Sequence, residues 1–266
     1  MMKPESVAIL RSPQSHEPLR LESKTEPDGT VAAALVSIPS GERYPMRDGI
    51  PVLLDQSTVT GSNLRYQRAY DRAARLYDPA IGLVAALAGG NERRFRWGYL
   101  ERLGIHAGQR VLEVSVGTGA NLRCLPRGPE YHALDISWGM LTRCRANLAR
   151  WAFEAELYQG NAQALPFRDE TFDVVFHVGG INAFEDRALA LSEMLRVART
   201  GARLLVVDET AKAMEALSWF PGVRKVLEEY SGRFEAPVEL LPDSARGVEA
   251  VPIVKGWLYC LTCVKD

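Results

Sequence analysis

The sequence predicts an α/β fold in which a mostly parallel sheet lies between two layers of helices. From residue 109 onward, apolar runs of strand length alternate with helical stretches, which is typical of a parallel sheet covered on both faces. Two further β-like runs close the chain and meet at Lys255-Gly256, so an antiparallel C-terminal hairpin is expected. Residues 1–60 are proline-rich and strand-like without this alternation, and they predict a small, separate β-rich domain.

The alternating region supplies seven strands and the helices that connect them. The strands are expected over residues 110–116, 131–136, 156–159, 172–178, 203–208, 248–254 and 257–264. The helices are expected over residues 120–125, 139–152, 188–198 and 211–230. The chain therefore divides into a domain of residues 1–60 and a larger domain of residues 61–266, whose core begins at residue 105.

Two helical stretches, over residues 63–89 and 91–103, precede the first strand of the core. Asn91 is placed to cap the second helix, and Gly104 is placed to end it. The apolar run over residues 81–90 is much shorter than the roughly 20 residues that a bilayer crossing needs. Residues 61–104 are therefore expected to form a helical lid over a pocket.

The clearest functional signal is the segment VLEVSVGTGAN over residues 111–121. Gly117 and Gly119 let the backbone turn sharply and approach a ligand closely. Asp135 follows at the end of the next strand, where its carboxylate can accept hydrogen bonds from both hydroxyls of a ribose. This pattern predicts a nucleotide-type pocket for either a dinucleotide or S-adenosylmethionine.

Two motifs compete for the glycine loop. As a dinucleotide fingerprint it places Ser115 where the first glycine belongs. As the first motif of a class I methyltransferase, acid-x-Gly-x-Gly-x-Gly, it begins at Glu113 and again has Ser115 at one glycine position. The downstream strings GNAQALPF, TFDVVF and EMLRVARTGARLLVVDE decide between them, because in order and spacing they resemble the later motifs of S-adenosylmethionine-dependent methyltransferases. The resemblance covers residues 64–266.

Two further strings narrow the resemblance. YQRAYDRAARLYD over residues 66–78 and GGINAFED over residues 179–186 are similar to the branch that contains ubiquinone and menaquinone C-methyltransferases and phospholipid N-methyltransferases. The resemblance implies a Rossmann-like seven-stranded sheet, S-adenosylmethionine as the cofactor, and a small-molecule acceptor, hydrophobic or anionic, that is methylated at carbon, oxygen or nitrogen.

The resemblance also implies roles for individual residues. Glu113 is expected to face the methionyl end of the cofactor, Asp135 its ribose and Ile136 its adenine. Asn161 stands where the family usually has an aspartate beside adenine, and its amide can still pair with the base. The serine at a glycine position is expected to crowd the cofactor or to require a negative φ. The complete expected set of cofactor contacts is Glu113, Ser115, Gly117, Thr118, Gly119, Asp135, Ile136, Asn161, Ala162 and His177.

Catalytic candidates are fewer. His177 follows an apolar strand at the position where this fold exposes residues between cofactor and acceptor, and it could accept a proton near neutral pH. Tyr70 and Tyr77 are two helical turns apart and share one face of the lid, where they could close over the pocket or belong to an aromatic core. Asn182 and Glu209 are further candidates on the acceptor side.

The N-terminal segment resembles small zinc-ribbon proteins that accompany methyltransferases or are fused to them. Their pattern runs Cys-Pro-x-Cys and then Tyr-Pro-Ile-x-x-Gly-Ile-Pro, whereas this chain has Ser12 and Ser15 at the cysteine positions. Because a structural zinc needs about four sulfur or nitrogen ligands, no metal is expected. Apolar packing of Ile50, Val52 and Leu53 is expected to hold the unit together.

Composition limits the other functional classes. A net charge of −1 disfavours a broad basic surface for nucleic acid, although arginines over residues 61–103 outnumber acids there and admit an anionic substrate or a membrane surface as a contact. The four cysteines give no disulfide framework, and the Cys-x-x-Cys at residues 260–263 reads as part of a packed strand. A cytoplasmic protein is expected.

Three alternatives to small-molecule methylation remain open. The N-terminal ribbon motivates an RNA methyltransferase. The altered positions Ser115 and Asn161, with the ribbon that lacks cysteines, motivate a catalytically degenerate core that binds or activates a partner. A nicotinamide-dependent oxidoreductase is the third.

Overall fold

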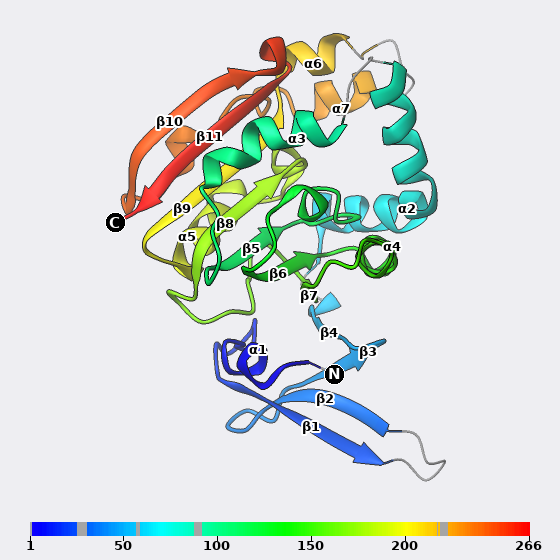
Figure 1. Ribbon diagram of the computed structural model, residues 1–266, viewed down its shortest axis with the longest axis vertical. Helices are drawn as coiled ribbons and strands as arrows, with labels where there is room; N and C mark the ends of the chain where they lie inside the picture. Colours follow the sequence, from blue (N-terminus) through cyan, green and yellow to red (C-terminus); the bar gives the residue numbers. More distant parts are fainter. Residues whose placement is uncertain (1, 26–30, 57–58, 88–91, 217, 219–222) are drawn as a thin grey trace.

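The computed structural model describes residues 2–25, 31–56, 59–87, 92–216, 218 and 223–266 (Figure 1). Helix α2 spans Gly61–Leu87, but the side chains of residues 75–77 and 79–87 lie outside the described part, as does the expected helix cap Asn91. Among the described helices, none combines the length and the apolar character that a bilayer crossing needs.

Eleven described strands form one sheet in the order β1-β2-β3-β4-β7-β6-β5-β8-β9-β11-β10. Five central strands run parallel: β5 (Arg110–Val114), β6 (Glu130–Asp135), β7 (Glu156–Gly160), β8 (Phe172–Val178) and β9 (Ala198–Glu209). Strands β11 (Leu258–Lys265) and β10 (Ala245–Ile253) add the antiparallel hairpin, with β11 next to β9. The expected fold class is confirmed, because these seven strands are mostly parallel with an antiparallel C-terminal pair.

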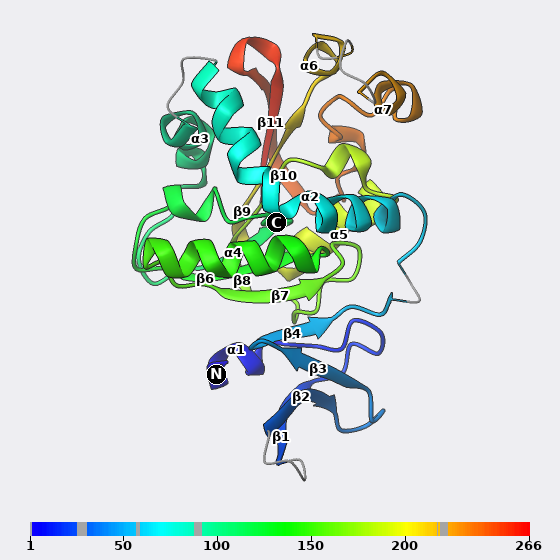
Figure 2. The ribbon, with the colours of Figure 1, turned by 90° about the vertical axis from the view of Figure 1, so that its right-hand side faces the viewer.

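Helices cover both faces of this central sheet. On one face, α5 (Arg187–Val197) contributes Leu191 and Met194 to a buried cluster with Val175 of β8. On the other face, α4 (Trp138–Trp151) and α3 (Glu92–Leu100) contribute Leu141 and Leu100 to a second cluster. Figure 2 shows α4 lying across the strands β6, β7 and β8. The parallel strands are apolar along both faces because both faces are buried.

Two expected helices differ from the structure. Residues 120–125 form only the short 3₁₀ turn η3 (Leu122–Cys124), because Pro126 follows and disfavours a helical conformation in the residue before it. The expected helix over 211–230 is two shorter helices, α6 (Ala211–Ala216) and α7 (Val223–Glu229), with Pro221 and Gly222 in the sequence between them.

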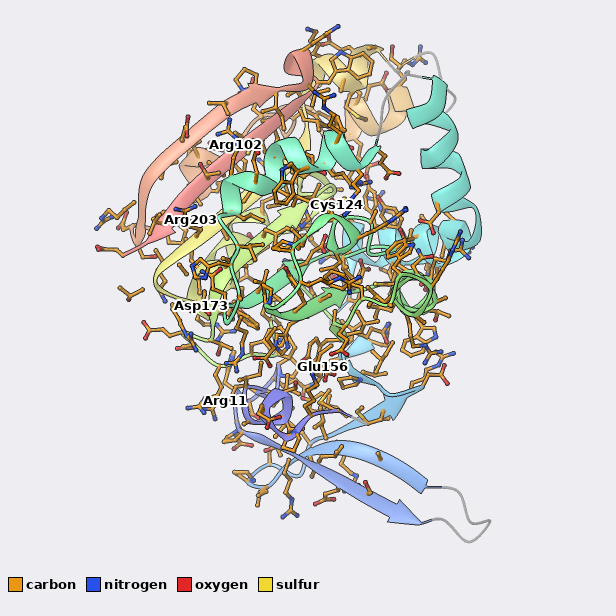
Figure 3. All side chains as sticks on the ribbon, in the orientation of Figure 1. Arg11, Arg102, Cys124, Glu156, Asp173 and Arg203 are labelled. Carbon is orange, nitrogen blue, oxygen red and sulfur yellow. The ribbon has the colours of Figure 1, made fainter. Side chains whose placement is uncertain are left out.

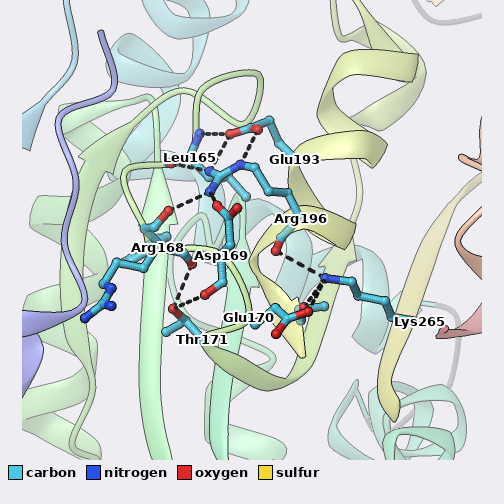
Figure 4. A network of polar contacts seen from close by, with 10 residues as sticks. Leu165, Arg168, Asp169, Glu170, Thr171, Glu193, Arg196 and Lys265 are labelled. Carbon is cyan, nitrogen blue, oxygen red and sulfur yellow. Dashed lines mark hydrogen bonds and ion pairs between the residues drawn. The ribbon is translucent and has the colours of Figure 1, made fainter. Parts of the chain in front are cut away.

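A half-buried arginine connects the segment before β8 to helix α5 (Figure 4). Arg196 donates from Nη1 to the carbonyl oxygen of Phe167 at 2.8 Å and from Nη2 to that of Leu165 at 2.9 Å. Its Nε donates to Glu193 Oε1 at 2.6 Å, and the other oxygen of Glu193 accepts from the Leu165 amide at 2.8 Å. One ion pair therefore satisfies the backbone of an irregular segment that would otherwise be buried without partners.

The N-terminal unit consists of α1 (Pro4–Ala8), β1 (Leu19–Thr25), β2 (Val31–Ser37), β3 (Arg43–Arg47) and β4 (Ile50–Leu53). Strand β4 pairs in parallel with β7 of the core, so that Val52 opposes Gln159 and Leu53 opposes Gly160. The Arg11 amide donates to the carbonyl oxygen of Pro166 at 3.0 Å, and Figure 3 labels Arg11 at this junction. The unit therefore extends the central sheet at the edge formed by β7.

Two Ser-x-x-Ser turns face each other inside this unit. Ser12 and Ser15 both donate to the carboxylate of Glu42, Ser15 at 3.0 Å, while Ser12 Oγ accepts from the amides of residues 14 and 15. In the second turn, the Ser37 hydroxyl and the Ser40 amide donate to Glu17 Oε2. In the described part of the chain, no group of three or more His, Cys, Asp or Glu side chains is arranged to hold a metal ion. Ser15 also donates to Glu17 Oε2 at 3.3 Å, so a hydrogen-bonded network connects the two turns.

The junction between β4 and β7 gives a stability prediction. Leu53 is fully buried there, so Leu53→Ala is expected to lower the free energy of unfolding by about 2–5 kcal/mol through lost burial and a residual cavity. Urea unfolding measures the change. The control is Ile38→Ala at a side chain that is 65% exposed, for which a loss below about 0.5 kcal/mol is expected. Equal losses in the two variants would show that the junction contributes little.

Candidate functional site

A cavity of about 370 Å³ lies at the carboxyl ends of strands β5, β6, β8 and β9. In open parallel sheets, ligands bind at this edge of the strands. Of the expected site residues, the cavity wall includes Tyr70, Ser115, Gly117, Thr118, Asp135 and Ile136. The structure therefore brings together residues from the lid helix, the glycine loop and the end of the second parallel strand.

The glycine loop keeps a left-handed backbone at all three of its special positions. Gly117 has a φ of 56° and Gly119 a φ of 82°, and Ser115 has a φ of 61°. The expectation of a negative φ at Ser115 is therefore wrong. The residue adopts the conformation that a glycine would take, at a cost of roughly 1–2 kcal/mol. The loop keeps its turn despite the serine.

Asp135 connects this loop to the start of helix α4. Its Oδ2 accepts from the Gly117 amide at 2.8 Å, and its Oδ1 accepts from the Ser137 amide at 2.9 Å. Burial raises the pKa of Asp135 to about 6, while the two backbone amides act in the opposite direction. Each carboxylate oxygen can accept a second hydrogen bond, so the group can still receive donors from the cavity.

Glu113 lies behind the loop and is fully buried, without lining the cavity. Its Oε1 accepts from the Asn121 side-chain amide at 2.7 Å, whereas its Oε2 has no partner among the described residues. Asn121 Oδ1 in turn accepts from Arg96 Nη1 at 2.8 Å and from the Tyr99 hydroxyl at 3.2 Å. A chain of hydrogen bonds therefore joins a buried carboxylate to a guanidinium at the cavity wall.

Sequence reasoning missed Arg96 and Asn121, both of which line this cavity. Arg96 is one of eight arginines between residues 61 and 103, and nothing in its spacing distinguishes it from the other seven. Asn121 closes the motif VLEVSVGTGAN, but its role depends on the packing of α3 against the loop.

His177 differs from the expected exposed base. It is fully buried within β8 and does not line the cavity. Its Nδ1 lies 3.0 Å from the carbonyl oxygen of Val114, and its Nε2 has no partner in the described part of the chain. Burial lowers the pKa of His177 to about 4. The expectation that His177 accepts a proton near neutral pH is therefore wrong. The ring of Phe184, which lines the cavity, lies 5.2 Å from the imidazole.

The acceptor-side candidates Asn182 and Glu209 line the cavity, whereas the remaining expected residues lie elsewhere. Gly119 packs against α4, where an added Cβ would lie 2.9 Å from Cys144 Sγ. Ala162 is buried in the core. Asn161 lines a separate, more open cleft of about 810 Å³ beside the N-terminal unit, and its Oδ1 accepts from the Gln163 amide at 3.0 Å. The side chain of Tyr77 lies outside the described part of the chain.

The expected lid is fastened to the core along the first half of α2. Gln67 donates to the carbonyl oxygen of Ile136 at 3.2 Å. Asp71 accepts from the Ser137 hydroxyl at 2.5 Å and from the Gly139 amide at 2.8 Å, at the N-terminus of α4. A carboxylate in this position also interacts favourably with the helix dipole. This part of α2 forms a fixed wall of the cavity.

The buried Glu113 gives a prediction about pH. Burial raises its pKa from the ordinary 4.5 to about 8, so between these values the unfolded chain has lost a proton that the folded chain retains. The free energy of unfolding should therefore fall as pH rises from about 5 to 8, by about 2–4 kcal/mol from this group. Urea unfolding at the two pH values measures the fall.

Variants separate Glu113 from other titrating groups. Glu113→Gln should remove most of the fall, since the amide does not titrate. Glu154→Gln, at a side chain that is 93% exposed, should leave it unchanged. An equally steep fall in Glu113→Gln would assign the pH dependence to another group.

Comparisons with known proteins agree with this geometry. Residues 112–206 match the family model described as a methyltransferase domain. A demethylmenaquinone methyltransferase of Beutenbergia cavernae is 35% identical over 140 residues, or 52% of this chain and 55% of that protein. A ubiquinone/menaquinone biosynthesis C-methyltransferase of Hahella chejuensis is 33% identical over 159 residues, or 58% of this chain and 63% of that protein. The chain thus spans less than two thirds of these two relatives.

Solved structures support the fold. A candidate S-adenosyl-L-methionine-dependent methyltransferase of Methanococcus maripaludis matches with a TM-score of 0.57 at 18% identity, over 74% of this chain and 93% of that chain. Phosphoethanolamine N-methyltransferase 2 of Haemonchus contortus, in complex with S-adenosyl-L-methionine, matches with a TM-score of 0.53 at 16% identity, over 65% of this chain and 52% of that chain.

One relative extends further along the chain. A demethylmenaquinone methyltransferase of Mycobacterium sp. (strain KMS) is 32% identical over 184 residues, which are 69% of this chain and 71% of that protein. The chain belongs to the S-adenosylmethionine-dependent methyltransferase family.

Proposed function

We propose that this protein transfers a methyl group from S-adenosylmethionine to a small-molecule acceptor. The observation that carries the proposal is the position of Asp135, which lies on the cavity wall and holds the Gly117 amide at 2.8 Å. A carboxylate beside a left-handed glycine loop, at the carboxyl ends of parallel strands, suits the ribose of a nucleoside. The cavity volume of about 370 Å³ is typical of small-molecule sites.

The charged groups of the cavity suit the methionyl end of this cofactor, which carries an ammonium and a carboxylate. Arg96 would attract the carboxylate at the cavity wall. Glu113 has a buried oxygen without a partner, and an ammonium beyond Asn121 would favour its charged form. Ile136 and Met140 supply apolar surface on the same wall for the adenine.

The chain's contribution to the reaction is positioning. When bound, S-adenosylmethionine supplies a methyl group on a sulfonium that an acceptor atom displaces in line. The residues of the cavity must therefore hold the cofactor at one end and orient the acceptor at the other. The first half of α2 is hydrogen-bonded to the core beside this cavity, so it helps to keep bulk water away from the reacting atoms.

The left-handed φ of Ser115 supports binding rather than a closed site, because the loop retains the backbone shape that glycine would give it. The relatives named above are quinone-pathway methyltransferases by name, and they support a small organic acceptor as the substrate class.

Calorimetric titration with S-adenosylmethionine and with S-adenosylhomocysteine tests the proposal. Micromolar binding of both is expected for the wild type. Asp135→Ala should weaken it by about 10- to 100-fold, since a charged hydrogen-bond acceptor is lost. Asp243→Ala, at an exposed surface position, should bind like the wild type. A correctly folded wild-type protein that bound neither compound would refute the proposal.

A further inference from the structure

The half of the cavity away from the glycine loop has a chemical character of its own. It is built by the lid helix, by the loop after β8, by the end of β9 and by the segment from α6 onward. Its described lining includes five aromatic rings and two acids, beside amide and small apolar side chains: Tyr66, Tyr70, Phe184, Asp208, Glu209, Tyr230 and Phe234, with Asn63, Asn182, Ala183 and Met214. This half remains for the acceptor when the cofactor occupies the other.

The aromatic side chains form a connected wall. The ring centroid of Tyr66 lies 6.1 Å from that of Tyr70 and 6.0 Å from that of Tyr230. Phe184 and Phe234 add two rings from other segments. Five rings from three parts of the chain, namely α2, the loop after β8 and residues 230–234, therefore line one cavity, and their faces carry partial negative charge.

Two adjacent carboxyl groups lie against this wall. Asp208 is buried and accepts from the amides of Gly180 at 3.1 Å, Asn182 at 2.8 Å and Glu209 at 3.0 Å. Burial first, and the neighbouring Glu209 carboxyl second, raise the pKa of Asp208 well above its ordinary value. Backbone amides thus supply hydrogen bonds to both carboxyl oxygens of Asp208. The half-buried Glu209 has no ion pair within the described residues.

Cations are missing from this half of the wall, as far as the structure describes it. Among the lining residues the only basic side chain is Arg96, which pairs with Glu92 and Asn121 near the glycine loop. Arg65 and Arg233 contact Tyr230, but neither lines the cavity. An anionic acceptor would therefore meet Glu209 and the aromatic faces without a compensating positive charge, which is unfavourable in a partly buried site.

We propose that the acceptor presents a protonated amine to Glu209 and to the aromatic wall, and is methylated on that nitrogen. This inference rests on the proposed function, because it assigns the acceptor of the same site. Aromatic faces together with a carboxylate are the combination that recognises organic ammonium groups. This assignment differs from the hydrophobic or anionic acceptor that the sequence resemblance implies.

The proton balance follows from the position of Glu209. The bound ammonium gives one proton to the Glu209 carboxylate, which frees the nitrogen lone pair. That lone pair forms the new nitrogen–carbon bond while the carbon–sulfur bond breaks, and the bonding electrons remain on sulfur. The product is a methylated ammonium and S-adenosylhomocysteine, and Glu209 returns its proton to water.

The experiment compares three probes that share a phenyl ring and differ in charge: benzylamine, benzyl alcohol and benzoate. Each is titrated calorimetrically at pH 7 into the full chain, with and without saturating S-adenosylhomocysteine. Benzylamine is expected to bind at least about tenfold more tightly than benzyl alcohol, and benzoate more weakly than both. Glu209→Gln should reduce the benzylamine preference to below about threefold while the affinity for S-adenosylhomocysteine stays within twofold.

Glu228→Gln is the matched control, because this acid is exposed on α7 and pairs with Arg224 outside the cavity. It should keep the full preference for benzylamine. Equal binding of benzylamine and benzyl alcohol, tighter binding of benzoate, no binding of any probe, or an undiminished preference in Glu209→Gln would each overturn the inference. Failure of S-adenosylhomocysteine to bind would instead count against the proposed function, and the titrations without it would still test the amine site.

Discussion

The hydrogen bond from the Gly117 amide to the Asp135 carboxylate, at 2.8 Å, is the interaction on which the site depends. It joins the end of β6 to the glycine loop that follows β5, and so holds these two parts of the cavity wall together. A second backbone amide, from Ser137, holds the other oxygen and orients the start of α4. Because the group is buried, these amides offset part of the cost of keeping a carboxylate there. The lid helix then attaches to the same corner through Asp71.

The sequence allowed the centre of this arrangement to be predicted because its signals are local. Gly117 and Gly119 mark a sharp turn after one strand, and Asp135 marks the end of the next. Both signals can be read from the order of residues along the chain. The fold class was equally accessible, since the alternation of apolar runs with helices reflects a sheet buried on both faces. The boundaries were less secure where a proline ends a helical run, as at Pro126.

Residues that act through packing could not be predicted in the same way. Arg96 reaches the cavity only because α3 lies beside the loop, and no spacing rule selects it from the other arginines of that region. Glu113 and His177 were expected at the surface of the pocket, yet both are fully buried. The sequence correctly places both residues near the ends of strands. It does not indicate that their side chains are buried behind the cavity wall. Ser37 and Ser40 were missed because their importance appears only when two distant turns come together around Glu17.

The pairing of β4 with β7 changes which strands end the sheet. Without β4, strand β7, which lies next to β6 of the cavity wall, would present unpaired amides and carbonyls to other chains. With it, the outermost strands are β1 at one end and β10 at the other. Arg20 and Glu22 lie two residues apart along β1, and such charges discourage a second chain from adding to an exposed edge. Since the covering strand belongs to the same polypeptide, its protection does not weaken on dilution, and the open edge is moved away from the functional end of the molecule.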